Sequence, residues 1–505
     1  MSEYLHGAYG KIQAVGARVA DRSLQAIVYI GTAPVHTLAL GSGESYPVNK
    51  PILVNNIAEA RKYLGYSDDW AKYTLCEAMH VHLEEKGVGP LVMINVLDPT
   101  KAEHKNATKA TTSQTPVGGR ITLASAEDII LDSVVIKTIV EDGETPVTKV
   151  KNTDYTISYN IDKKQIIIAE ITSGTLGTAA LTVEYYTIKP SGVTSADVIG
   201  STDNLGLNTG LYAIQNVYQA TGYVPAFLLA PGFSQIPAVH AAMYANSVKI
   251  NGHWDAYMFV DMPIVDNETA LTMATAYTWK VANSYTHENE TVFFPLAKGV
   301  DGNIYHLSVL AAANFQELLI AQDGIPYKTA SNTECGLIEN LYLGENVVGR
   351  LFDDRLINEH LNKNGIASAA YVGGRWALWG CHCADYDQQN GDNVNVAETN
   401  RMMLYYISND FQHRRTEDVD KPMSANDLQT IVAEEQTRID ALLNIRALTY
   451  GVVSLNAEAD DRSDILNGDF SFTFNITTTP LAKSLTAIVN WTDDGFVTYF
   501  ETLTA

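Results

Sequence analysis

Two groups of residues in this sequence carry side chains that commonly bind metal ions. Cys381, His382 and Cys383 are adjacent, and His80 and His82 lie two positions apart in a segment with helical spacing. Three consecutive side chains cannot easily face one tetrahedral ion, and histidines at i and i+2 point to different faces of a helix. No second cysteine or histidine pair stands at zinc-finger spacing in the sequence. We therefore expect no metal site, and the sequence predicts no bound cofactor.

A serine nucleophile is the second kind of chemistry to consider, because Ser234 follows an apolar, strand-like run and precedes a helical pattern. Hydrolase nucleophiles stand at such turns, but the tight elbow around them needs glycine two residues later, where this chain has Ile236. We expect instead that Gly232 permits the bend and that Ser234 caps the following helix. An α/β hydrolase-like enzyme that pairs Ser234 with a carboxylate such as Asp261 is the alternative function.

Carboxylates and glycine-rich loops give weaker signals. Asp261 and Asp266 follow a buried strand, at the edge where α/β proteins bind ligands, but such aspartates more often stabilise loops or helix ends. Gly200, Gly206 and Gly210 are too widely spaced for a dinucleotide loop, and the sequence has no G-x-x-x-x-G-K-[ST] motif. We expect that the protein is not an enzyme.

The composition is that of a globular, acidic chain. Its 505 residues suggest roughly three domains, and 46% are hydrophobic against 18% charged. There are 34 Lys and Arg against 58 Asp and Glu, a net charge of −24 that disfavours binding to nucleic acid. The apolar runs are too short to cross a membrane. Four cysteines and the lack of a signal-peptide pattern at the first residues favour a reducing cytoplasm.

The elements that would position these residues alternate between strands and helices. Apolar runs at 24–31 and 90–98 predict buried strands, and between them we expect helices at 57–64, capped by Asn55 or Asn56, and at 72–86. After residue 200 three further strand and helix pairs follow, which predicts a covered, mostly parallel sheet. Residues 101–190 form short alternating runs rich in Thr, Val and Ile, which predict an inserted β-sandwich.

The C-terminal part mixes helices with strands. Residues 393–451 show helical spacing, with a capping box at Ser424 and Asp427 and an apolar stripe that ends at Gly451. Alternation at 469–476 and apolar runs at 484–491 and 495–503 predict three strands. The fold class is therefore mixed α/β. We divide the chain into an extended arm (1–24), a first part of the α/β body (25–100), the β insertion (101–195), a central α/β domain (196–392) and a C-terminal domain (393–505).

The two ends of the chain are unusual because neither can pair all of its backbone N–H and C=O groups by itself. The glycine-punctuated arm has no apolar stripe long enough to pack on a core, and the last strand pattern runs almost to the C-terminus. Strand addition between neighbouring subunits would satisfy both ends, and a chain that donates at one end and accepts at the other builds rings or helices. The alternative is that both ends pair within one subunit or fray.

Several segments together resemble the tail sheath proteins of contractile phage tails and of R-type, phage-tail-like bacteriocins. They include HGAYGKIQAVG (6–16), SLQAIVYIGTAP (23–34), the stretch from TSADVIG to APGFS (194–234), the stretch from GLIENLYLG to RWALWG (336–380) and VNVAETNRMMLYYIS (394–408). The order of elements between 194 and 234 is the most specific signal. The family often has arginines after VNV and Arg-Thr after WG, whereas Ala397-Glu398 and Cys381-His382 stand here. Contacts at those positions are not carried over.

The resemblance implies a structural polymer. It implies six subunits per ring, rings stacked helically around an inner tail tube, and a contraction that drives the tube through a cell envelope. The implied partners are further copies of this chain, the inner tube, the baseplate and the tail terminator. Assembly would take place in the bacterial host cytoplasm, as part of a virion tail or a phage-tail-like particle. The resemblance also implies strands exchanged between subunits, which we place at Ile12, Ala14, Val15, Val19, Val489, Trp491, Phe496, Val497, Tyr499 and Phe500.

The same resemblance places the tube attachment in the C-terminal helices. We take Glu434, Glu435, Arg438 and Arg446 as candidate contacts, although ordinary solvated helix faces carry such charges as well. The insertion would lie on the outer surface. A surface-layer or adhesin-like protein that binds receptors through the insertion is a third interpretation, which the missing signal-peptide pattern disfavours.

Overall fold

A computed structural model describes residues 25–41, 43–140, 145–266, 269–344, 354–386, 394–455, 462–493 and 496. The chain divides into two compact units, Met1–Lys421 and Pro422–Ala505, and each is described here by itself. The predicted N-terminal arm, with the candidate exchange residues Ile12, Ala14, Val15 and Val19, lies outside the described residues.

An eight-stranded sheet forms the centre of the first unit, with the strand order β2-β3-β1-β11-β12-β15-β19-β20. Pairs from β3 to β19 are parallel, while β2 and β20 are antiparallel at the two edges. The inner strands are buried along nearly their whole length, which confirms the predicted covered, mostly parallel sheet. The strands are β1 (Gln25–Gly31), β2 (Pro51–Val54), β3 (Leu91–Asn95), β11 (Val224–Leu229), β12 (Tyr257–Asp261), β15 (Glu290–Phe293), β19 (Ile366–Val372) and β20 (Arg375–Trp379).

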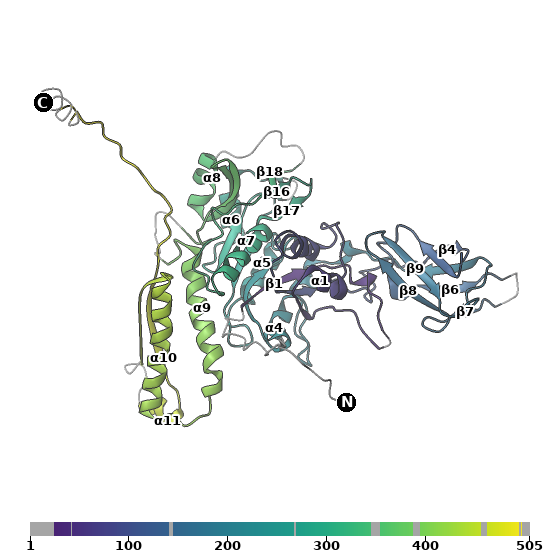
Figure 1. The fold of residues 1–505 in the computed structure, drawn as a ribbon, viewed down its shortest axis with the longest axis horizontal. Coiled ribbons are helices and arrows are strands. Elements are labelled where there is room, and N and C mark those ends of the chain that lie inside the picture. Colours follow the sequence, from purple (N-terminus) through teal and green to yellow (C-terminus); the bar gives the residue numbers. More distant parts are fainter. Residues whose placement is uncertain are drawn as a thin grey trace, which may run out of the picture. The chain divides into compact units, whose positions relative to one another are not determined.

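Helices gather around this sheet (Figure 1). The Asn56 side chain caps the first of them by accepting the N–H of Glu59 at 2.9 Å, as predicted. The predicted helix at 72–86 is an α-helix that continues as a π-helix, Met79–Glu85. Among the described residues no helix combines the length and the apolar character needed to cross a membrane. The α-helices of this unit are α1 (Ile57–Leu64), α2 (Thr74–Ala78), α3 (Ser195–Ile199), α4 (Val217–Thr221), α5 (Pro237–Ala245), α6 (Met273–Ala282), α7 (Leu307–Ala321), α8 (Asp354–His360) and α9 (Glu398–Arg415).

The insertion folds as two small antiparallel sheets around their own core, which confirms the predicted β-sandwich. Tyr155 and Ile157 point inward and are buried, as their alternation predicts. Its strands are β4 (Ala110–Gln114), β5 (Arg120–Leu123), β6 (Val135–Thr138), β7 (Thr148–Lys149), β8 (Tyr155–Asn160), β9 (Gln165–Glu170) and β10 (Leu181–Tyr185). Other short strands of the first unit are β13 (Val265–Asp266), β14 (Thr269–Ala270), β16 (Leu296–Gly299), β17 (Ile304–Tyr305) and β18 (Ile338–Tyr342).

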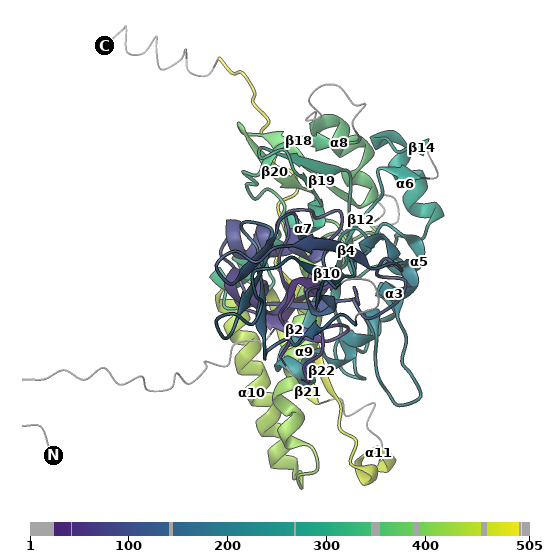
Figure 2. The ribbon, with the colours of Figure 1, turned by 90° about the vertical axis from the view of Figure 1, so that its right-hand side faces the viewer.

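The second unit is built from a long helix and a β-hairpin that runs alongside it (Figures 1 and 2). The helix is α10 (Ala425–Asn444), the hairpin strands are β21 (Leu448–Leu455) and β22 (Phe472–Thr478), and α11 (Arg462–Asn467) lies between them in sequence. The predicted capping box is confirmed, because Ser424 and Asp427 bond each other's backbone N–H groups. The predicted helical run to Gly451 is wrong: Arg446 adopts a left-handed conformation (φ 63°), which ends the helix, and Gly451 lies within β21.

The chain after the hairpin does not form the strand predicted at 484–491. The hairpin is closed at Thr479, whose N–H donates to Ala447 O (3.2 Å) and whose hydroxyl donates to Arg446 O (2.7 Å). Residues 480–493 then leave it as an extended chain without helix or strand (Figures 1 and 2). The prediction is wrong for the single chain because a strand exists only with a hydrogen-bonded neighbour, and β-propensity alone does not supply one.

Candidate functional site

The carboxyl edge of the body sheet is the first candidate, because α/β proteins bind ligands there, where the strand order reverses. In this fold the reversal falls between β1 and β11. Thr74 of α2 fills that position: a Cβ added at Gly31 would collide with its hydroxyl, and one added at Gly232 would lie 2.9 Å from its methyl carbon. Thr32 holds Thr74 in place by accepting its backbone N–H at 3.0 Å. The crevice that could hold a ligand is therefore occupied by the chain's own side chain.

Ser234 and Asp261 meet at this edge, but both are buried, with 0% and 1% of their surface exposed. The Ser234 hydroxyl accepts the backbone N–H of Asp261 at 3.2 Å. The Asp261 carboxylate accepts the N–H of Ser308 at 3.0 Å and also the Ser308 hydroxyl, so it caps the first turn of α7. These contacts confirm Asp261 as a helix-end residue. Ser234 does not cap α5, which starts at Pro237 after Ile236, so that prediction is wrong. The Asp266 side chain lies outside the described part.

A buried ion pair completes the edge. The Glu77 carboxylate lies 2.6 Å from Nδ1 of His306 and also accepts the His306 backbone N–H at 2.6 Å. Burial opposes the charged imidazolium, but the charge and hydrogen bond of Glu77, with Asp261 nearby, raise the pKa of His306 to about 9. Burial raises the pKa of Asp261. These polar groups are bonded to one another, so they stabilise the edge and present no reactive group to a substrate.

The histidine and cysteine groups are likewise occupied by internal contacts. His82 is buried between the Tyr29 hydroxyl (2.7 Å) and the Gln316 amide oxygen (2.6 Å), while His80 bonds Glu84. Burial lowers the pKa of His82 to about 4. The two histidines thus point to different neighbours, as their spacing predicts. His382 stacks on Tyr386, and the Tyr257 hydroxyl donates to the Cys383 sulfur at 3.6 Å. Within the described ranges no three His, Cys, Asp or Glu residues are grouped to hold a metal ion.

The terminal segment, residues 484–493, has the opposite character. It carries four large apolar side chains that are almost fully exposed: Leu485 (90%), Ile488 (83%), Val489 (90%) and Trp491 (81%). Phe496, a little further along, is 54% exposed. Apolar side chains concentrated in this way mark an interaction site. Of the predicted exchange residues, Val489, Trp491 and Phe496 therefore stand exposed on the described chain, and Val497, Tyr499 and Phe500 lie outside it.

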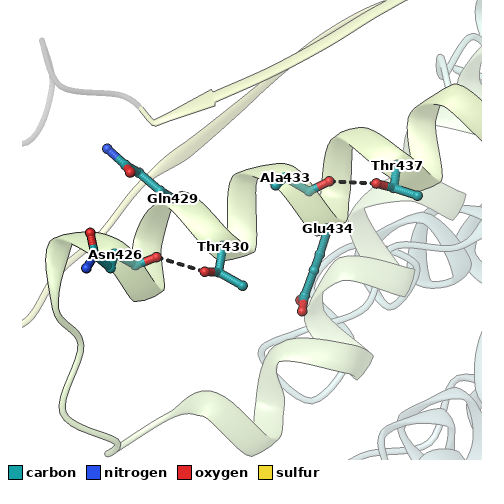
Figure 3. Close-up of a pocket in the computed structure, with 6 residues that line it drawn as sticks. All are labelled: Asn426, Gln429, Thr430, Ala433, Glu434 and Thr437. Atoms are coloured by element: carbon teal, nitrogen blue, oxygen red, sulfur yellow. Dashed lines mark hydrogen bonds between the residues drawn. The ribbon is translucent and has the colours of Figure 1, made fainter.

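Helix α10 holds three of the four candidate tube contacts, and Arg446 lies just after its end. An open groove runs along its exposed side, and Figure 3 shows the side chains of Thr430, Glu434 and Thr437 along it. Both threonine hydroxyls donate to carbonyl oxygens four residues earlier, at 2.8 Å. The groove is lined by Asn426, Gln429, Thr430, Ala433, Glu434 and Thr437. Of the candidates, Glu434, Arg438 and Arg446 are exposed, whereas Glu435 is only 1% exposed.

Sequence reasoning missed the two features that close the carboxyl edge. Glu77 and His306 lie 229 positions apart, so no local pattern could pair them. Thr74 looked like an ordinary residue at the start of a helix. The only local signals were Gly31 and Gly232, which allow the close approach of Thr74 and which the sequence explains equally well as strand ends.

Comparison with known proteins gives one curated relative. The tail sheath protein of Burkholderia phage BcepMu is 29% identical over 269 residues, which covers 52% of this chain and 50% of that protein. This chain thus spans about half the length of the curated relative that it matches. No protein-family model matches the sequence.

Solved structures match the whole fold. A chain of the anti-feeding prophage (AFP) baseplate aligns with a TM-score of 0.54 and 12% identity, over 98% of this chain and 100% of that one. The AFP helical sheath in its contracted state aligns with 0.53 and 11% identity, over the same shares. The PVC sheath complex of an extracellular contractile injection system, also contracted, aligns with 0.51 and 11%, over 98% of each chain.

These matches define the class: the chain has the fold of contractile sheath proteins, and the mixed α/β prediction is confirmed. The predicted resemblance to tail sheath proteins is confirmed as well, by the relative from the Burkholderia phage. These four proteins carry the names of structural components of tails or injection systems rather than of enzymes.

Proposed function

We propose that this chain is the structural subunit of a contractile tail sheath. Copies polymerise as stacked hexameric rings around an inner tail tube, and the sheath contracts to drive the tube through a target cell envelope. Baseplate and tail terminator proteins bound the polymer, which assembles in the bacterial host cytoplasm as part of a virion tail or phage-tail-like particle. The fold and the relative named above support this function.

The observation that carries the proposal is the exposed terminal segment. Ile488, Val489 and Trp491 stand more than four-fifths exposed on a chain that leaves its own hairpin. A strand from this segment, added to the sheet of a second copy, satisfies its backbone and covers its apolar side chains. Because the segment and its acceptor are different surfaces, each copy binds the next head to tail, and the contact propagates.

The free energies of apolar burial and of chain ordering explain why a single junction between two copies is weak. Burying four large apolar side chains contributes about 1.5–3 kcal/mol each, or about 6–12 kcal/mol. Ordering about eight residues costs about 1–2 kcal/mol each, or about 8–16 kcal/mol. The two sums nearly cancel, so a single junction is weak. Several junctions per subunit, made together, give stable association without any nucleotide.

The candidate tube contacts Glu434, Glu435, Arg438 and Arg446 belong to the same proposal, with α10 as the helix that meets the tube. Glu434, Arg438 and Arg446 are exposed and able to form salt-sensitive contacts, whereas Glu435 is buried in the single chain. The inserted sandwich lies on the outer surface of the sheath in this arrangement. The hydrolase alternative has no comparable support. Ser234 and Asp261 are both buried, and the Ser234 hydroxyl accepts the backbone N–H of Asp261.

The proposal is tested by electron microscopy and sedimentation of the purified chain. The full-length protein is expected to form hollow, ribbed tubes with six-fold symmetry, alone or when its cognate tube is added. A variant that lacks residues 484–505 keeps the anchor at Thr479 and is expected to stay a folded monomer. A full-length protein that forms no tubes even around its cognate tube would overturn the sheath assignment.

A further inference from the structure

One side chain of the second unit, Gln436, forms the hydrogen bonds with β21 that the backbone of a neighbouring strand would form. The Gln436 amide nitrogen donates to the carbonyl oxygen of Gly451 (3.2 Å), and its amide oxygen accepts the N–H of Val453 (2.8 Å). Its nitrogen also donates to the Asp440 carboxylate one turn along α10 (2.8 Å). Since the ladder to β22 fills the space between the two hairpin strands, these groups belong to the other, outer edge of β21.

The bonding pattern is that of a neighbouring strand. In a parallel ladder one residue binds the carbonyl of residue i−1 and the N–H of residue i+1 on the facing strand. The Gln436 amide binds Gly451 and Val453, which flank Val452 in this way. It therefore fills the slot of one residue at the middle of the outer edge.

Glycine at position 451 makes this arrangement possible. A Cβ added at Gly451 would collide with the Cγ2 methyl of Ile439, which is buried between helix and hairpin. With no side chain there, α10 lies close enough to β21 for a glutamine to reach past the strand to its edge. A helix held further away could not supply the second hydrogen bond.

We propose that Gln436 is a specificity-determining residue of assembly: it closes the outer edge of β21, so that no strand from a second copy pairs there. This inference rests on the proposed function, in which the incoming strand is the terminal segment, residues 484–493, of another copy. An unprotected edge is a template for any exposed apolar strand, and each copy carries one. With this edge closed, a strand from another copy can pair with the hairpin only at its other edge, which fixes where the incoming strand is added.

The test compares the full-length Gln436→Ala variant with wild type and with Gln429→Ala, a matched glutamine on the exposed side of the same helix. Hydrogen exchange of the Val453 amide, measured on unassembled protein, is expected to be at least tenfold faster in Gln436→Ala and unchanged in Gln429→Ala. A labelled peptide of residues 484–493 is expected to bind with one more site per chain in Gln436→Ala than in wild type. Should this variant not fold, Gln436→Met keeps the length of the side chain but removes both the donor to Gly451 and the acceptor for Val453, and faster exchange at Val453 is still expected.

Equal exchange at Val453 in variant and wild type would overturn the inference, and so would equal peptide stoichiometry. Failure of the proposed function is distinguishable, because it appears as a wild-type chain that forms no tubes. In that case the exchange of Val453 still decides whether Gln436 closes the edge.

Discussion

The carboxyl edge of the body sheet carries residue types that catalyse reactions in other proteins, and the terminal segment carries residue types that bind partners. The fold buries the first group and exposes the second. At the edge, Ser234, Asp261 and Glu77 are buried and bonded within the chain. In the terminal segment, Ile488 and Val489 are exposed to solvent and do not belong to the core of the chain. The edge is finished within one molecule, whereas the proposed function gives the segment its partner in a second copy.

Under the proposed function, this difference places the working surface of the chain in the terminal segment rather than at the carboxyl edge. In an enzyme the polar edge would stay open and the apolar surface would be covered. Here Thr74 plugs the crevice and the apolar surface lies at the end of the chain. The comparison is testable, because changes at the edge should affect folding alone and changes in the segment should affect assembly alone.

The largest effect on folding is expected from Glu77→Ala. Removing the buried carboxylate leaves the partly buried His306 without its ion-pair partner, which is expected to cost up to about 3–5 kcal/mol of unfolding free energy. Denaturant unfolding followed by circular dichroism measures it. Glu359→Ala is the matched control, because its salt bridge to Arg355 is exposed and is worth less than about 1 kcal/mol. Similar costs for the two variants would show that the edge is not the closed structure described.

Much of this fold could be predicted because its signals are local. Asn56 caps α1 through its immediate neighbours, and Tyr155 and Ile157 alternate within one strand. Contacts between distant residues could not be predicted, as Glu77 with His306 shows.

Two further failures have physical reasons of their own. The apolar stripe of α10 continues into β21 with no break in hydrophobicity, and the end of the helix depends on Arg446 adopting positive φ, which its residue type does not reveal. The strand predicted at 484–491 has the right composition, but pairing requires an edge that composition does not contain.

A smaller effect is expected at the hairpin. Gly451→Ala forces a methyl group against Ile439 and is expected to cost about 1–3 kcal/mol in the second unit. Hydrogen exchange over β21 and β22 is the measurement, with Gly336→Ala as control because its added methyl group meets nothing within 4 Å. Unchanged exchange in Gly451→Ala would contradict the close packing of α10 on β21.

The pH dependence of stability should show the closed edge as well. The pKa of His306 is raised to about 9, so its contribution is complete below about pH 6.5 and is lost as pH rises through 9. His36 and His82, whose pKa values burial lowers to about 4, act in the other direction: their contribution is present above about pH 6.5 and is lost as pH falls towards 4. These three histidines by themselves predict denaturation midpoints that peak near pH 6.5. Glu77→Gln should reduce the loss of stability between about pH 6.5 and 9. An unaltered loss of stability in this range would contradict the pairing of Glu77 with His306.

Ser234→Ala is expected to cost about 1–2 kcal/mol, the value of one hydrogen bond to the buried N–H of Asp261. Assembly into tubes should be unaffected. The hydrolase alternative predicts instead that this change abolishes a measurable ester or amide hydrolysis by the wild-type protein. Assays of hydrolysis and of tube formation on the same preparations separate the two functions.

The smallest effect on folding is expected from Ile488→Asp/Val489→Asp, because both side chains are exposed and surface changes rarely exceed about 0.5 kcal/mol. Its effect on assembly should be complete, because charged side chains cannot be buried at a junction without partners. Ile488→Leu/Val489→Ile, which keeps both side chains apolar, is the control and should still assemble.

The most direct test of this account is sedimentation velocity on the wild-type chain and on Ile488→Asp/Val489→Asp, with thermal unfolding of the same samples. We expect fast-sedimenting tubes from wild type, only monomer from the double variant, and matching unfolding curves from unassembled protein. Tubes formed equally by both proteins would contradict the claim that the terminal segment joins the subunits.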